Sequence, residues 1–191
     1  MTNEYVSLEE KIAKNLSQKL GSSLKLSELE TAKIEYGLST LLVELIKLVF
    51  IYAVAAFLQI VPAVIVTHVT FFAIRRNSYG YHASKSWLCT IQSIFLLVIV
   101  PFIAIFFDIT VSRLVFLSAA AFLTVIIGIK GPAINPKRLK AGIEKTRMKA
   151  ILVSIVILFI GIAIPSDFYR TDILLGMISA TILLFIKVKE S

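Results

Sequence analysis

The chain has 191 residues, of which 58% are hydrophobic and only 17% are charged, and its formal net charge is +8. Its mean hydropathy of +0.88 excludes an ordinary soluble domain of this size, because such a domain needs a charged exterior. Several apolar runs have roughly the 17 to 25 residues that a membrane-spanning helix requires. The composition therefore predicts an all-α integral membrane protein with about six transmembrane helices.

The positive net charge and the single cysteine also limit the function. A single cysteine excludes an internal disulfide, and no group of histidine, cysteine and carboxylate residues resembles a metal site. We therefore expect neither a metal nor a cofactor. In a membrane protein, excess positive charge is more typical of loops that face anionic lipid than of nucleic-acid binding. Anionic membrane lipid, and not nucleic acid, is the expected partner of these loops.

Residues 1–37 are polar and lack the apolar core and cleavage site of a secretory signal. Within them, Ser7 and Glu10 form a capping-box pattern and Gly21 is typical of a helix end. This predicts an amphipathic helix whose apolar face either lies on the inner leaflet, binds a helical partner, or packs on the cytoplasmic end of the bundle. We treat this region as a cytoplasmic appendage to one membrane domain, residues 38–191. The apolar stripe consists of Leu8, Ile12, Leu16 and Leu20.

A second capping-box pattern, Ser27 with Glu30, predicts a helix that continues into the first membrane segment. That segment carries Glu44 and Lys47, which are three residues apart and are expected to pair on one helix face. The second segment is short and contains His68, which is more typical of a helix–helix hydrogen bond than of a catalyst. The predicted segments cover approximately residues 41–58, 63–74, 89–107, 114–129, 150–164 and 173–186.

The distribution of basic residues predicts the orientation. Six segments place both termini on one side of the membrane, and all of the 20 basic residues except Lys47, Arg113 and Arg170 lie on that side. By the positive-inside rule, both termini are cytoplasmic. The polar loop formed by residues 75–89 is then cytoplasmic as well.

This loop, RRNSYGYHASKSWLC, contains the only cysteine of the chain, Cys89, and one of its two histidines, His82. A cysteine is a nucleophile only as its thiolate. Nearby arginines, a histidine that can accept the thiol proton, and a helix that begins near Ser86 would each favour the thiolate form. Gln92, one turn beyond the cysteine, is a candidate donor to an oxyanion. The alternative is that these residues are ordinary constituents of a membrane interface.

The spacing between His82 and Cys89 constrains the backbone. Seven residues of straight helix rise about 10 Å, which is too far for a hydrogen bond between the two side chains. A catalytic pair therefore requires the chain to fold back. Gly80 permits such a loop. We predict a broken or re-entrant segment around the histidine and a third span that begins near Ser86.

At these positions the sequence resembles the accessory gene regulator B family, which are integral membrane cysteine endopeptidases of Gram-positive bacteria. The matching residues extend to Ala83 and to residues 91–93, and a basic loop with prolines, residues 131–138, also fits. Many members have a second glycine where this chain has Tyr79. The motif residues are Arg75, Gly80, His82 and Cys89.

The resemblance implies that His82 and Cys89 cleave a short precursor peptide of a quorum-sensing signal through a thioester, which then closes a thiolactone ring. It implies a location in the bacterial cell membrane and permits a homodimer. Arg75 would hold a substrate carboxylate or carbonyl, or else anchor the helix at the interface. Lys137 and Arg138 would bind an acidic tail of the precursor, or else only orient the loop against anionic lipid.

Two other functions remain open from the sequence. A small multi-pass transporter or peptide exporter would use Glu44, Lys47 and His68 to line a polar path. Against it, the chain lacks paired discontinuous helices in two matching halves. The other alternative is a non-enzymatic membrane partner of a receptor kinase, which no feature of the sequence supports directly.

Overall fold

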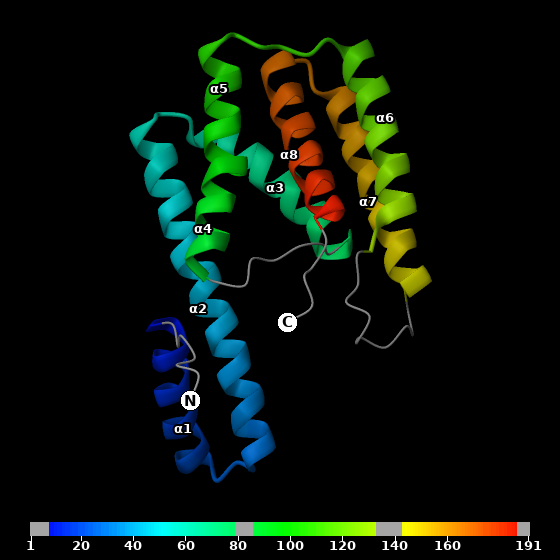
Figure 1. Ribbon diagram of the computed structural model, residues 1–191. Helices are drawn as coiled ribbons and strands as arrows, with labels where there is room; N and C mark the ends of the chain where they lie inside the picture. The colour runs from blue at the N-terminus through cyan, green and yellow to red at the C-terminus, as the bar shows by residue number, and fades with distance from the viewer. Residues whose placement is uncertain (1–7, 79–85, 133–142, 187–191) are drawn as a thin grey trace.

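The structure is a computed structural model that describes residues 8–78, 86–132 and 143–186, and every regular element in these ranges is a helix (Figure 1). Five helical stretches there are long and apolar enough to cross a membrane: α2, Trp87–Phe106, α6, α7 and α8. The predicted all-α membrane architecture is confirmed, whereas the number of six spans stays a prediction. The elements are α1 (Leu8–Leu24), α2 (Glu28–Phe57), α3 (Val61–Ser78), α4 (Ser86–Ile94), η1 (Phe95–Ile99), α5 (Val100–Phe106), α6 (Arg113–Lys130), α7 (Ile143–Ala163) and α8 (Asp167–Phe185).

The centre of the bundle is the contact between α3 and α8. Helix α8 is the most buried of the five candidate spans, and α3 crosses it closely (Figure 1). Gly176 of α8 makes this approach possible, because a Cβ atom there would lie 2.7 Å from both the Thr67 carbonyl oxygen and the Thr70 Cβ. The hydroxyl of Thr67 donates a hydrogen bond to the Asp172 carbonyl at 3.2 Å. Small residues at a membrane helix interface thus position α3, which leads to the candidate site.

Replacing Gly176 by alanine is expected to lower thermal stability, because the added methyl group forces α3 and α8 apart. Overpacking of this kind typically costs about 1–3 kcal/mol. Gly37 of α2 is the matched control, since a Cβ there meets nothing within 4 Å and alanine is the better helix former. Thermal unfolding of the purified protein, followed by circular dichroism at 222 nm, measures both variants. Equal melting temperatures would contradict the close-packing role of Gly176.

Helices α1 and α2 form a hairpin. Helix α1 and the N-terminal half of α2 extend beyond the bundle (Figure 1). Small residues of α1, namely Ala13, Ser17 and Gly21, are buried there. The prediction that Gly21 ends the helix is wrong: α1 continues to Leu24 and is followed by Lys25 with a φ of 50°. The glycine instead permits close packing, because a Cβ there would lie 2.6 Å from Thr31 Oγ1. Three residues of the predicted apolar stripe remain at least one-third exposed: Ile12, Leu16 and Leu20.

Helix α2 agrees with both local predictions for it. Its first turn contains the capping box, in which the Ser27 amide donates to Glu30 Oε2 at 2.9 Å and the Glu30 amide donates to Ser27 Oγ at 3.4 Å. The helix then runs without a break to Phe57. The predicted pair is present, with Lys47 Nζ 2.7 Å from Glu44 Oε1. Since Lys47 is buried and Glu44 is exposed, the carboxylate partly compensates a charge that would otherwise be buried alone.

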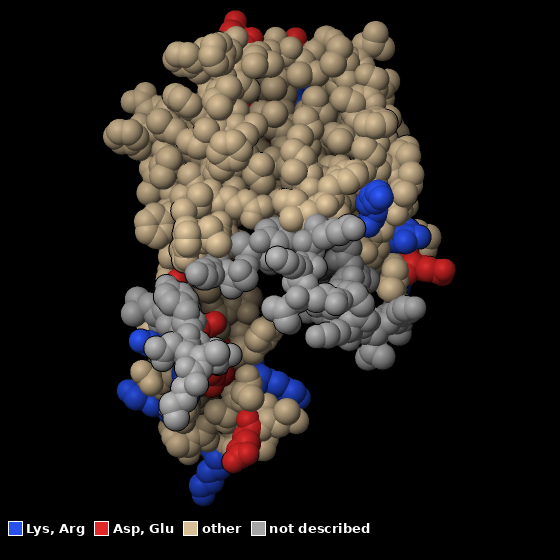
Figure 2. Space-filling view, viewed as in Figure 1, with Lys and Arg blue, Asp and Glu red and all other residues tan. Residues whose placement is uncertain are grey.

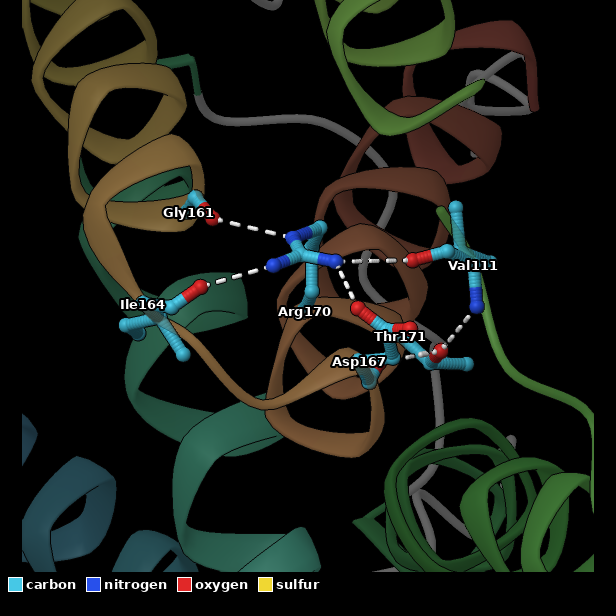
Figure 3. Close-up of polar contacts among 6 residues, drawn as sticks. All are labelled: Val111, Gly161, Ile164, Asp167, Arg170 and Thr171. Carbon is cyan, nitrogen blue, oxygen red and sulfur yellow. Dashed lines mark hydrogen bonds and ion pairs between the residues drawn. The ribbon is translucent and has the colours of Figure 1, made fainter. Parts of the chain in front are cut away.

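At the end of the bundle opposite the α1–α2 hairpin, Arg170 joins three segments (Figure 3). Its side chain is fully buried and donates to the carbonyl oxygens of Val111, Gly161 and Ile164 at 2.7–3.2 Å, and to the Asp167 carboxylate. The neighbouring hydroxyl of Thr171 accepts a hydrogen bond from the Val111 amide. One guanidinium group therefore ties the residues before α6, the end of α7 and the start of α8 together.

Charged residues are concentrated at the two ends of the molecule. Figure 2 shows basic and acidic side chains together over the α1–α2 hairpin and beside the end of α6 and the start of α7. A wide belt almost free of charge lies above them, and acidic groups lie at the far edge. The belt is what a membrane protein presents to lipid. Helices α3 and α6 end, and α4 and α7 begin, at the basic end of the bundle (Figure 1). The assignment of this end to the cytoplasm stays a prediction.

Candidate functional site

The candidate site lies where α3 ends and α4 begins. The structure describes α3 as far as Ser78 and α4 from Ser86 onward, so the predicted start of the third span near Ser86 stays a prediction. Cys89 is the fourth residue of α4, half-buried and not in a disulfide. Gly80 and His82 lie outside the described residues, so the predicted break in the helix around His82 is not tested.

Arg75 reaches this site from the other helix. It follows the apolar part of α3, in a helix that is not among the five candidate spans. Burial lowers the pKa of its guanidinium to about 10, and the charge of Cys89 acts in the opposite direction. The two residues are 14 positions apart in sequence, yet the fold brings them within electrostatic range.

The surface of α4 around Cys89 is apolar and accessible. Trp87 and Ile91 are each at least half exposed, and Gln92, one turn beyond the cysteine, is half-buried. The helix then widens into the π-helical segment η1, directly before Pro101. Proline lacks an amide hydrogen and its ring clashes with the preceding turn, so a wider turn accommodates it without ending the helix. The candidate nucleophile therefore lies on a short helix that is continuous with a proline-containing candidate span, Trp87–Phe106.

The ends of α3 and α6 and the start of α7 meet beside this site. A Cβ on Gly131 would lie 3.4 Å from the Cβ of Ser78, and Arg147 donates from Nε to the Gly131 carbonyl at 3.0 Å. Neither Ser78 nor Arg147 is predicted from the sequence to belong to the site. In the sequence, Arg147 is one of many basic residues of its loop and has no distinguishing pattern. Lys137 and Arg138 lie outside the described residues.

His68 forms a hydrogen bond between helices, as predicted for a lone histidine in the second membrane segment. Its Nδ1 lies 3.1 Å from the Tyr52 hydroxyl, which joins α3 to α2. His68 and Arg75 are seven residues apart on α3, so about 10 Å of helix axis separates His68 from Arg75 of the candidate site. The predicted helix–helix hydrogen bond is confirmed.

The described helices, their apolar surface and their basic end define an all-α integral membrane protein. Residues 10–187 match the family model described as accessory gene regulator B. The chain belongs to the accessory gene regulator B family.

Individual relatives match over most of their length. The chain is 29% identical over 181 residues to accessory gene regulator protein B of Staphylococcus intermedius, covering 92% of this chain and 94% of the relative. It is 30% identical over 176 residues to the protein of the same name from Staphylococcus saprophyticus, covering 90% of each. No solved structure matches the chain at a significant level.

Proposed function

We propose that this protein is a membrane cysteine endopeptidase that cleaves a short precursor peptide of a quorum-sensing signal and closes the product into a thiolactone ring. The observation that carries the proposal is the position of Cys89, in the first turn of α4 and within electrostatic range of Arg75. Both residues belong to the four-residue motif by which the sequence resembles membrane cysteine endopeptidases. His82, the proposed base, lies between them in sequence.

The chemistry needs only residues of this chain and of the precursor. The His82 imidazole takes the thiol proton of Cys89, and the sulfur attacks a peptide carbonyl carbon. The peptide C–N bond breaks, the departing amine receives the proton from the imidazolium, and an acyl thioester remains on Cys89. A thiol within the precursor then gives its proton to the His82 imidazole and attacks this thioester, and Cys89 leaves as the thiolate beside the imidazolium. Because one thioester replaces another, the ring forms without further activation.

Arg75 has two possible contributions in this mechanism. Its guanidinium stabilises negative charge that develops near the sulfur during the attack, and it presents donors to a carboxylate or carbonyl of the precursor. Burial of Arg75 supports both, since an electrostatic interaction is stronger where water is excluded. Gln92 lies one turn beyond Cys89 on α4, and it is the proposed donor to the oxyanion that forms during the attack. Lys137 and Arg138 are proposed to bind an acidic tail of the precursor.

The test is to detect the acyl-enzyme directly. Membranes that contain this protein are mixed with a candidate precursor peptide encoded beside it, and adducts are analysed by gel and mass spectrometry. We expect a hydroxylamine-sensitive adduct on Cys89 that disappears in Cys89→Ala and is depleted in His82→Ala. If a precursor that the wild-type cells convert to product gives no adduct, and Cys89→Ala still converts it, the proposal is wrong. A transporter or exporter would then be the better description.

A further inference from the structure

A groove of about 410 Å³ lies between the last turn of α3 and the first half of α7. Its walls are almost entirely apolar. Three of its lining residues, Asn77, Lys145 and Lys149, have polar side chains, and they line it almost entirely with their apolar atoms. It is separate from Cys89, which is not among its lining residues. The groove is lined by Asn77, Lys145, Met148, Lys149, Leu152 and Val153.

The polar ends of the side chains that line the groove suit a phosphate. Lys145 and Lys149 are one helical turn apart, so they extend from the same face of α7. Both are exposed, and neither forms a salt bridge with any residue that the structure describes. The Asn77 amide nitrogen donates to the Ala73 carbonyl at 3.2 Å and keeps a second hydrogen for a ligand. By contrast, the neighbouring Arg147 is bound to the Gly131 carbonyl.

The apolar part of the groove continues into a surface that a membrane covers. Met148 and Leu152 are 68% and 62% exposed, and Phe159, two turns further along α7, is 65% exposed. Helix α7 is one of the five candidate membrane spans. An apolar stripe on such a helix faces lipid chains, and lysines near the end of a membrane helix extend toward the headgroups.

We propose that this groove is a binding site for an anionic phospholipid. The phosphate lies between Lys145 and Lys149, and one acyl chain lies along Met148 and Leu152. Basic grooves between membrane helices recognise anionic headgroups in this way. An acidic peptide would satisfy the lysines equally well. An acidic peptide would offer no apolar chain to cover the apolar wall of the groove and its continuation along α7. A phospholipid offers both a charged headgroup and an apolar chain, so it fits the whole groove better. This proposal does not depend on the proposed protease activity.

The test is native mass spectrometry of the full-length protein in micelles that contain phosphatidylglycerol or phosphatidylcholine with identical acyl chains. We expect the wild type to retain one phosphatidylglycerol molecule in preference to phosphatidylcholine. Lys145→Gln with Lys149→Gln should weaken that binding roughly thirtyfold, since each lysine near an anionic headgroup contributes a several-fold gain in affinity. Lys145→Arg with Lys149→Arg keeps both charges and should retain most of the affinity.

The matched control is Lys14→Gln with Lys19→Gln, which removes the same charge from exposed positions of α1. It should change the affinity for phosphatidylglycerol by no more than about twofold. An equal loss in this control would show general attraction to anionic lipid and would overturn the site. Equal retention of both lipids by the wild type would also overturn it. So would displacement of phosphatidylglycerol by an acidic precursor peptide at equimolar concentration, which would identify a peptide site.

Discussion

The double variant Cys89→Ala with His82→Ala is expected to process the precursor no more slowly than Cys89→Ala alone. Residues that act as one catalytic unit are strongly non-additive, because removing the nucleophile leaves the base nothing to activate. Each single variant should lose about 10³-fold or more in the rate of cleavage, as in other nucleophile–base pairs. The measurement is the initial rate of cleavage of a synthetic precursor by the purified protein in vesicles. Independent roles would instead give losses that multiply.

His68→Gln provides the control for this experiment. It removes the only other histidine of the chain but keeps a side chain that can bind the Tyr52 hydroxyl, which lies 3.1 Å from His68 Nδ1. We expect its cleavage rate to stay within about threefold of wild type, since a hydrogen bond between membrane helices contributes only about 0.6 kcal/mol on average. A loss in His68→Gln as large as in His82→Ala would reassign the base to His68.

Arg170→Met is expected to produce the largest loss of stability among single substitutions of charged residues in the described ranges. Arg170 is fully buried and donates to three carbonyl groups and one carboxylate. Its removal leaves those acceptors without a donor, and breaking a buried charged network typically costs about 3–5 kcal/mol. Since 1 kcal/mol shifts the melting temperature of a protein of this size by about 2–4 °C, the expected shift is roughly 10 °C.

The matched control is Arg113→Met. Arg113 begins α6 near the same end of the bundle but is exposed, so its replacement should change stability by less than about 0.5 kcal/mol. Thermal unfolding of the purified proteins in the same detergent compares the two variants. If Arg170→Met and Arg113→Met melt together, the network in Figure 3 does not stabilise the bundle. The second variant also shows whether loss of any positive charge at this end has an effect.

Local features of this protein could be predicted from neighbouring residues. The capping box of Ser27 and Glu30 and the Glu44–Lys47 pair each involve residues three positions apart, and both are present. The wrong prediction, that Gly21 ends α1, has an equally clear reason. A glycine is typical both of helix ends and of close helix contacts. Only the position of Thr31 on the next helix distinguishes the two.

Composition and short spacings were enough to predict the all-α membrane class, the basic end of the molecule and the residues of the candidate site. The folded structure was needed to see that Arg75 of α3 lies within electrostatic range of Cys89 on α4. It also decided that Arg170 binds Val111, 59 residues away, and that Gly176 packs on Thr67. These contacts join distant segments, and they follow from the crossing of whole helices, which no local pattern records.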